Sequence, residues 1–352
     1  MKKRLSYILA PQHLLTVFLS LFLLSAVSSC SEDENSEAGK ATVKMTFTTR
    51  ASAQADGSST LEERERMKTL RVIMENANTG KILYNVFYDN LGSVTSKTIT
   101  FQDVPVEEGG TPFNFYAIAN EASFLTQGES LEGKEVDLDR LYHRDIAIDF
   151  NSQESEQLSI PQAKKNQKTI QPVPGMLEHT VQLEFPVAKV DVGFTNEIET
   201  EQTVADIRMP GLKVIGGKLF PQDFPQDFAG NGAAAPDEQV PEAGTAGDLA
   251  FTPNLLSVPA GTFGGEPGKA SVTSLYVYPA KSSSYKLTAR WSDAAKEQTV
   301  DLNQSGRLAD GIRRGMQLNI GITLKYGVMQ LDNLTVTVDN WTNADVITPE
   351  FQ

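Results

Sequence analysis

Short runs in which apolar and polar residues alternate recur along this 352-residue chain, with turn residues between them. The runs at 70–74 and 82–88 flank the turn sequence Asn-Ala-Asn-Thr-Gly, and this pair predicts a β-hairpin. The same kind of pattern predicts further strands at 97–101, 113–119, 145–150, 178–185, 188–195, 211–215, 272–278, 285–291, 298–302, 317–324 and 333–338. No long helical pattern alternates with these strands, so antiparallel sandwiches are favoured over a doubly wound sheet. The predicted fold class is all-β.

Helix is predicted at only two places. Thr60 and Glu63 have the spacing of a capping box, in which each side chain accepts a hydrogen bond from the backbone amide of the other residue. Residues 136–143 form the second predicted helix. Neither segment is long enough to change the fold class.

Two Pro-rich stretches indicate how the chain is divided. The stretch at 170–175 places a domain boundary near residue 176, which gives predicted domains at 51–176 and 177–352. Residues 221–248 contain the repeat PQDFPQDF and then many Ala, Gly and Pro residues. This second stretch has too few apolar side chains for a core strand and predicts a long surface loop.

The N-terminus has the pattern of an exported lipoprotein. A basic start is followed by the apolar run 14–27, which predicts a signal peptide over 1–29 and is too short for a membrane span. Small residues precede Cys30, the only cysteine of the chain, so we expect Cys30 to be acylated after signal-peptide cleavage. A single cysteine also excludes an internal disulfide. The acidic run Ser-Glu-Asp-Glu at 31–34 fits either a solvated tether or the export tag of surface lipoproteins in the Bacteroides group.

An early strand pattern ends abruptly. Val43, Met45 and Phe47 alternate with polar residues, as in a half-buried strand. The pattern stops at Arg50, and the small or polar residues at 51–59 offer nothing that could pack against a core. A well-formed strand is therefore joined to the rest of the chain by a loose segment that begins at an arginine.

Charge and motif content argue against nucleic-acid binding and catalysis. The formal charge is −14, and such an acidic surface repels phosphate backbones. His143 and His179 have no metal-ligand spacing, and no nucleophile elbow, P-loop or dinucleotide motif is present. The sequence from Asp301 begins like an EF-hand loop, but Ile312 stands where a bidentate Glu is needed, so a plain turn is expected. We expect no enzyme activity, no cofactor and no metal.

Five segments together resemble the fimbrillins, the pilin subunits of Bacteroides-type (type V) fimbriae. These are 62–76 with LRVIME, FYAIAN at 115–120, FPVAKV at 185–190, the segment 313–324 that opens RRGMQL, and VTVDNW at 336–341. Phe185 stands where the family often has Arg, and Gly315 and Leu318 replace the usual Asn and Tyr. The resemblance spans the chain from residue 30 to the C-terminus.

The resemblance implies both a fold and an assembly route. The fold is two tandem transthyretin-like antiparallel β-sandwich domains. Residues 30–50 would be a lipid-tethered propeptide, held in the outer membrane through Cys30 until an Arg-specific surface protease cuts between Arg50 and Ala51. The released groove would accept a C-terminal strand of another subunit, so that the protein ends in an extracellular fimbrium made of copies of itself and other fimbrial subunits.

The residues are compatible with this route. Val43, Met45 and Phe47 would each contribute roughly 1.5–3 kcal/mol when buried, and their removal would expose a groove open to strand addition. The donor strand is expected within 331–352. Its candidate side chains are Leu334, Val336, Val338, Trp341, Val346 and Ile347. If 334–338 is instead a permanent strand, the donor is confined to 340–352.

A non-polymerising surface lipoprotein is the alternative function. It would be a fimbrial anchor, a tip subunit, or a module that binds glycan or another adhesive ligand. Such binding sites favour exposed aromatic residues, and Trp291 and Trp341 are the only tryptophans. Trp291 lies in a predicted strand and Trp341 in the terminal motif VTVDNW, so both are expected to have structural roles. The alternating apolar C-terminal end favours a polymerising subunit, for which the resemblance implies roles in adhesion and biofilm formation.

Overall fold

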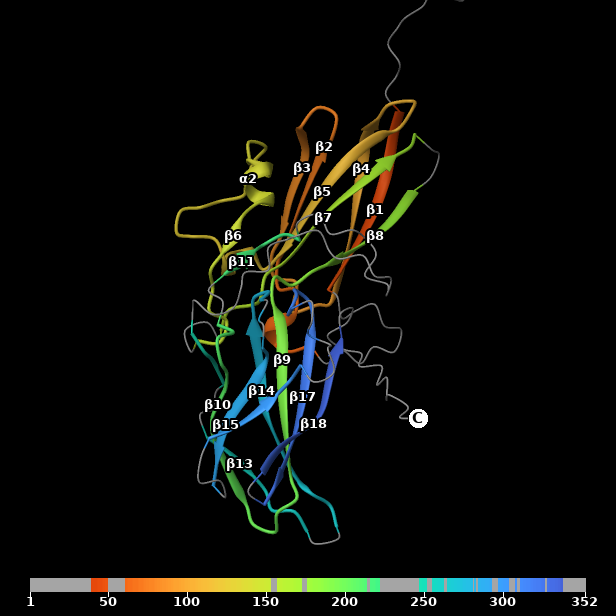
Figure 1. Ribbon diagram of the computed structural model, residues 1–352. Helices are drawn as coiled ribbons and strands as arrows, with labels where there is room; N and C mark the ends of the chain where they lie inside the picture. Colours follow the sequence, from red (N-terminus) through yellow and green to blue (C-terminus); the bar gives the residue numbers. More distant parts are fainter. Residues whose placement is uncertain are drawn as a thin grey trace, which may run out of the picture.

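The two β-sandwiches of the protein lie end to end in an elongated molecule (Figure 1). The computed structural model describes residues 39–49, 61–152, 157–172, 176–213, 216–221, 247–251, 255–262, 265–280, 282, 284–292, 297–303, 308, 311–326 and 328–337. The predicted signal peptide and most of the predicted loop 221–248 lie outside these residues.

The N-terminal sandwich packs a three-stranded sheet of order β4-β1-β8 against a four-stranded sheet of order β3-β2-β5-β7. Its strands are β1 (Gly39–Thr49), β2 (Leu70–Asn76), β3 (Lys81–Tyr88), β4 (Ser96–Val106), β5 (Thr111–Ala119), β7 (Gln162–Ile170) and β8 (Met176–Leu183). The predicted hairpin is confirmed as β2 and β3, which are antiparallel.

The C-terminal sandwich packs the sheet β14-β9-β17-β18 against the sheet β12-β10-β15-β16, with β13 also paired to β10. Its strands are β9 (Ala188–Asn196), β10 (Gln202–Met209), β12 (Leu249–Ala250), β13 (Leu255–Val258), β14 (Gly268–Val277), β15 (Lys286–Trp291), β16 (Gln298–Asp301), β17 (Gln317–Lys325) and β18 (Val328–Thr337). The predicted all-β class is confirmed by this architecture.

The middle strands β2 and β5 of the sheet β3-β2-β5-β7 are largely buried on both faces. In β5, Phe113 and Phe115 face the core of the N-terminal sandwich, whereas Tyr116 and Ile118 face a second apolar core on the other side. Successive side chains of a strand point to opposite faces, so a strand buried on both faces reads as a continuous apolar run. This explains why β5 lacks the alternation seen in β1.

The second core joins the two sandwiches. On the N-terminal side it includes α2 (Leu138–Tyr142) and part of the small sheet that β6 (Asp145–Ile146) forms with β11 (Gly217–Lys218). From the C-terminal side it includes Phe220 and Tyr278. The molecule therefore has a packed apolar junction between its sandwiches.

Some local predictions were wrong. The strand predicted at 145–150 is reduced to β6, and Gly211 lies in a turn with a φ of 69° instead of opening a strand. The predicted capping box lies two residues further along the chain, at Glu62 and Glu65. The helix at 136–143 is confirmed as α2, which is capped by Asp137.

The division of the chain near residue 176 remains a prediction. Beyond that residue, β8 pairs with β1, and its side chains Val181 and Leu183 belong to the core of the N-terminal sandwich. The N-terminal sandwich therefore uses residues up to 183. The described helices include none that is long and apolar enough to cross a membrane.

Candidate strand-exchange site

Strand β1 occupies the middle of its sheet. It pairs antiparallel with β4, where Met45 faces Ile99, and parallel with β8, where Met45 faces His179. The two neighbours come from different parts of the sequence: β4 begins within 50 residues of the end of β1, whereas β8 begins well over 100 residues after it. Removing β1 would therefore leave a gap between two strands instead of a bare sheet edge.

The inward face of β1 fills the core of the N-terminal sandwich. Its five inward side chains are exposed by 4% or less: Ala41, Val43, Met45, Phe47 and Thr49. Four of them are apolar and belong to one buried cluster with residues of β2, β4, β5 and β8. The three residues expected to anchor a removable strand are thus all buried.

The outward face of β1 is polar and partly exposed. Lys44 Nζ lies 2.9 Å from Glu178 Oε1 on β8, and the hydroxyl groups of Thr46 and Thr98 are 3.0 Å apart across the ladder with β4. Exposed pairs of this kind contribute little to stability. The inward face and the two backbone ladders therefore account for most of the hold on β1.

The described part of β1 ends one residue before the predicted cut. The backbone amide of Thr49 donates to the carbonyl of Thr95 at 2.8 Å, and the Thr49 side chain is buried. Arg50, Ala51 and the lipidation candidate Cys30 lie outside the described residues, so cleavage and acylation stay predictions.

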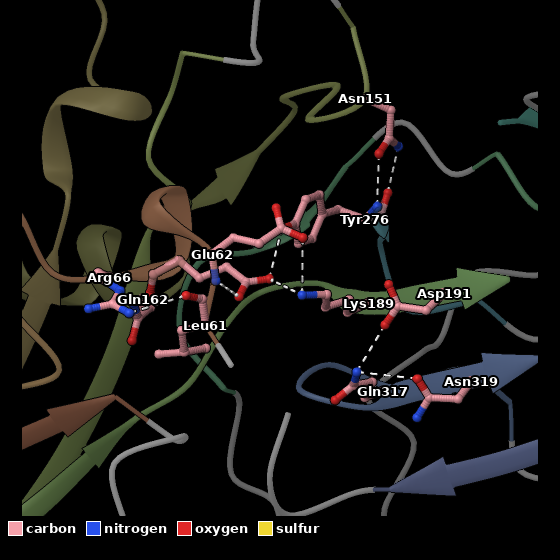
Figure 2. Close-up of polar contacts among 11 residues, drawn as sticks. Leu61, Glu62, Arg66, Asn151, Gln162, Lys189, Asp191, Tyr276, Gln317 and Asn319 are labelled. Carbon is pink, nitrogen blue, oxygen red and sulfur yellow. Dashed lines mark hydrogen bonds and ion pairs between the residues drawn. The ribbon is translucent and has the colours of Figure 1, made fainter. Parts of the chain in front are cut away.

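The segment that follows residue 60 is fixed where the two sandwiches meet. Glu65 is fully buried; its Oε1 accepts a hydrogen bond from Tyr276 Oη at 2.8 Å and lies 2.9 Å from Lys189 Nζ. Glu62 adds a second carboxylate, 3.3 Å from Lys189 Nζ. Figure 2 shows how the lysine and the tyrosine reach this segment from β9 and β14. We call Glu62, Glu65, Lys189 and Tyr276 the junction lock.

The junction lock is an ionic cluster in which Glu65, Lys189 and Tyr276 are all buried. Burial raises the pKa of Glu65, although Lys189 and Tyr276 stabilise its charged form. Burial opposes the charged form of Lys189 too, but the carboxylates of Glu65, Glu62 and Asp191 outweigh it and raise the lysine pKa. Burial and the two glutamates also raise the pKa of Tyr276, which keeps its hydroxyl protonated as a donor. A buried charge of this kind depends strongly on its partner.

Further hydrogen bonds hold the same turn from several elements. Glu62 and Glu65 form the capping box around the 3-10 turn η2 (Glu63–Glu65), with the Glu62 amide donating to Glu65 Oε2 at 2.8 Å. The side-chain amide of Gln162 donates to the carbonyl of Glu65 at 2.8 Å, and the Arg64 guanidinium donates to the carbonyl of Phe150 at 2.8 Å. Together with Lys189 and Tyr276, these bonds tie the turn to both sandwiches.

Asn120, at the end of the FYAIAN segment, fixes the backbone just after this turn. It adopts the left-handed conformation, with a φ of 58°. Its Oδ1 accepts from the amides of Lys68 at 2.9 Å and Thr69 at 3.4 Å. Its Nδ2 donates to the carbonyls of Arg66 at 3.0 Å and Ile160 at 2.9 Å. The resemblance motif thus contains a residue whose role is to satisfy four backbone groups.

The predicted donor residues fall into two groups. Leu334 and Val336 lie in β18, which pairs antiparallel with β17 at the edge of its sheet, and Leu334 is 8% exposed in the C-terminal core. Four donor candidates lie outside the described residues: Val338, Trp341, Val346 and Ile347. In this structure, then, the first two serve as part of the C-terminal sandwich.

Other candidate chemistry has structural explanations. His143 is exposed beside Asp139, and His179 is 3.0 Å from Asn166 Oδ1, with burial lowering its pKa. No cluster of three or more His, Cys, Asp or Glu suited to a metal occurs among the described residues. Trp291 is 3% exposed and therefore offers no surface platform.

Sequence reasoning missed the junction lock. Lys189 is the one charged side chain in the motif FPVAKV, and a lysine in an apolar strand indicates a buried partner. Glu65 lies in a segment dense in charge, LEERERMK, where nothing distinguishes the buried glutamate from its exposed neighbours. The signal for one half of the pair was present, but the signal for its partner was not.

No protein-family model and no curated protein sequence matches this chain. Solved structures do match it. The tip fimbrial protein Mfa3 of Porphyromonas gingivalis, with a C-terminal truncation, has a TM-score of 0.52 at 13% identity, over 86% of this chain and 100% of that chain. A fimbrial assembly protein of Parabacteroides distasonis has a TM-score of 0.47 at 12% identity, over 85% and 99% of the two chains. The fimbrial anchor protein Mfa2 of P. gingivalis has a TM-score of 0.38 at 10% identity, over 85% and 98%.

The likeness to Mfa3 is one of fold. Mfa3 is a fimbrial protein, in agreement with the family that the sequence resembles. The all-β sandwich prediction is confirmed by the same comparison.

Proposed function

We propose that this protein is a fimbrial subunit that polymerises after a protease removes its first strand. The precursor is exported, acylated at Cys30 and held at the outer membrane. Cleavage between Arg50 and Ala51 frees β1, and a C-terminal strand from another copy takes its place. The product is an extracellular fimbrium that supports adhesion and biofilm formation.

The central place of β1 in its sheet is the observation that carries this proposal. A strand removed from the edge of a sheet leaves one unpaired ladder, whereas the loss of β1 leaves two, facing each other across a groove. Five inward positions would be vacated at the same time. Such a groove can bind only an extended segment with matching alternate side chains, which is what donor-strand binding requires.

Cleavage matters because of the tether. While residues 50–69 join β1 to β2, the strand is present at an effective concentration of roughly millimolar for its own groove, so a competing strand is at a disadvantage. After the cut, β1 is a separate peptide. Once it dissociates, it loses the high effective concentration that the tether provided and rarely rebinds. A donor strand carried by another subunit then competes on equal terms.

The position of β18 bears on how a donor could leave the subunit. Thr337 faces Gln317, which in turn faces Lys189, so the described end of β18 lies beside the junction. A donor confined to 340–352 would therefore leave this subunit at the junction. A donor that includes Leu334 and Val336 would instead require β18 to separate from β17.

A non-polymerising role remains the second candidate. Mfa3, which matches with a TM-score of 0.52, is a tip protein, so this fold also occurs in a fimbrial position other than the stalk. In that case β1 is a permanent strand and Cys30 a permanent anchor. The partner would then be another fimbrial subunit or an adhesive ligand.

Controlled cleavage distinguishes these functions. Precursor lacking residues 1–29 is treated briefly with trypsin, and the products are followed by intact mass and by unheated denaturing electrophoresis. We expect a dominant product that begins at Ala51 and a ladder of detergent-resistant oligomers, with no ladder from the Arg50→Gln variant. Cutting that leaves only monomers would instead support the tip, anchor or binding role.

A further inference from the structure

Three arginines lie close together around the proposed cut. They are Arg50, Arg64 and Arg66, and a protease that recognises arginine alone has no reason in its specificity to prefer the first. A cut after Arg64 or Arg66 would remove Glu62, and with it part of the junction lock. The choice of site therefore matters to the product.

The backbone around Arg64 and Arg66 is held in place on both sides. The Arg64 carbonyl accepts from the amide of Ile160 at 2.7 Å, and the Met67 amide donates to the carbonyl of Val94 at 2.9 Å. Within the turn, the Glu65 amide donates to the carbonyl of Glu62 at 3.0 Å. A protease must draw several residues into an extended conformation, so it can cut here only after these bonds have opened.

Opening the turn requires breaking a buried ion pair. Glu65 lies between the two arginines in sequence, and its carboxylate is held by Lys189 and Tyr276 of the other sandwich. Pulling residues 61–67 into a protease cleft would leave Lys189, whose side chain is 7% exposed, without its closest carboxylate. Separating a buried charge from its partner is strongly unfavourable, so the open state is rare.

We propose that the junction lock directs Arg-specific cleavage to Arg50 instead of Arg64 or Arg66. Lys189 and Tyr276 act as positioning residues: they touch no scissile bond, but they keep the peptide bonds after Arg64 and Arg66 closed to protease. This inference rests on the proposed function, because it concerns the same maturation step. It also connects the second sandwich to the fate of the first strand.

The test is a comparison of cleavage sites in lock variants. Wild-type precursor and the Lys189→Met variant are treated with clostripain, an arginine-specific endopeptidase, and new N-termini are quantified by mass. Cleavage of a locally open state follows its population, so we expect products beginning at Glu65 and Met67 to form at least tenfold faster in Lys189→Met. The rate after Arg50 should stay within about twofold of wild type, because that bond already lies outside the lock.

Two matched variants separate the lock from general destabilisation. Lys325→Met removes a lysine that pairs with Glu197 at 3.7 Å on the exposed end of the same sandwich, and it should leave the pattern unchanged. Tyr276→Phe removes only the hydroxyl that donates to Glu65, and it should raise cleavage after Arg64 and Arg66 by a smaller factor. Tyr276→Phe also serves as the test if Lys189→Met fails to fold.

A synthetic peptide of residues 45–72 measures how fast each site is cut without a fold. We expect cleavage after all three arginines in the peptide. If the peptide resists after Arg64 and Arg66, its glutamates set the selectivity and the proposal is overturned. The proposal is also overturned if folded Lys189→Met and Tyr276→Phe are cut only after Arg50. Wild-type protein that resists at Arg50 contradicts the proposed function instead, whatever happens at the other two sites.

Discussion

Strands β1 and β18 are the first and last strands of the described chain, and both were predicted to take part in exchange. Their surroundings differ. β1 pairs along both edges and has five inward side chains exposed by 4% or less. β18 pairs only with β17 in its sheet, and its inward side chains Met329 and Leu334 are 6% and 8% exposed.

The difference teaches which strand can serve as a plug and which as a donor. Loss of β1 would divide a sheet and open a core, so a subunit that lost β1 would need a replacement strand. Loss of β18 exposes one edge of β17 and leaves the remaining three strands of that sheet paired. A strand that pairs along only one edge can leave its own sheet more easily, so β18 is better suited than β1 to act as a donor.

The largest effect should come from deleting each strand in turn. Without β1 the chain loses the burial of Val43, Met45 and Phe47, roughly 4.5–9 kcal/mol in all, which is comparable to the stability of a whole domain. Hydrogen exchange measured by mass should then show lost protection in β4 and β8. Deleting residues from 328 onward should cost less and expose mainly β17. Equal loss from the two deletions would contradict the comparison.

Single substitutions sharpen the same contrast. Phe47→Ala should lower the free energy of unfolding by about 3–5 kcal/mol, whereas Leu334→Ala should cost about 2 kcal/mol, since an edge site relaxes more easily. Phe194→Ala, in the buried β9, is the matched control for a lost phenylalanine and should leave protection of β4 and β8 intact. Denaturant unfolding and hydrogen exchange give the two readouts.

The junction lock should give a smaller, pH-dependent effect. At neutral pH, Lys189→Met should cost about 3 kcal/mol, because it leaves the Glu65 carboxylate buried without a counter-charge. A raised folded pKa gives stability below the unfolded value that is lost as pH rises through the folded one. The Glu65 pKa rises further without Lys189, so the cost of the variant should grow as pH increases above about 4.5. The cost should shrink again as pH rises through the folded pKa of Lys189, which lies above the ordinary value of about 10.5, because the wild-type lysine then loses its charge.

The double variant Glu65→Gln, Lys189→Met checks the assignment of that pH dependence. It has no titratable group at either position, so the cost of the double variant in stability should not grow as pH increases above about 4.5. Thermal unfolding between pH 4 and 8 suffices for the comparison. If the cost of the double variant still grows with pH, the pH dependence belongs to other groups.

The smallest effect is expected on the outward face of β1. Glu178→Gln removes an exposed ion pair with Lys44 and should change the free energy of unfolding by less than about 1 kcal/mol. A cost similar to that of Phe47→Ala would mean that β1 is held by its outer face as well. Denaturant unfolding at low and moderate salt is the measurement.

Much of the fold could be predicted because many strands bury one face or both. Alternation identified β1 and β9, and apolar runs identified β2 and β5. Strand β7 was missed because it lies at a sheet edge and carries Lys164, Lys165 and Lys168, as edge strands often do. Local pattern detects a strand through its buried side chains, and β7 has few.

Strand β10 was missed for a different reason. Its register with β15 shifts between Ala205 and Arg208, and Asp206 there has a φ of 52°. The bulge puts Val204 and Ile207, three residues apart, in the same core, which breaks the period of two. The candidate site was predictable only in part, because neither the parallel pairing of β1 with β8 nor the contact of Glu65 with Lys189 is local in sequence.

The parallel pairing of β1 with β8 has a mechanical consequence. β8 continues directly into β9 through residues 184–187, so tension along a fibre would pass from a strand seated in the place of β1, across the ladder to β8, and into the second sandwich. Such a pull acts along both strands. It loads the eight paired positions, Thr42 to Thr49, in shear. The hydrogen bonds between the two strands would then have to break together instead of one after another. A joint of this geometry would resist drag far better than the same hydrogen bonds peeled from one end.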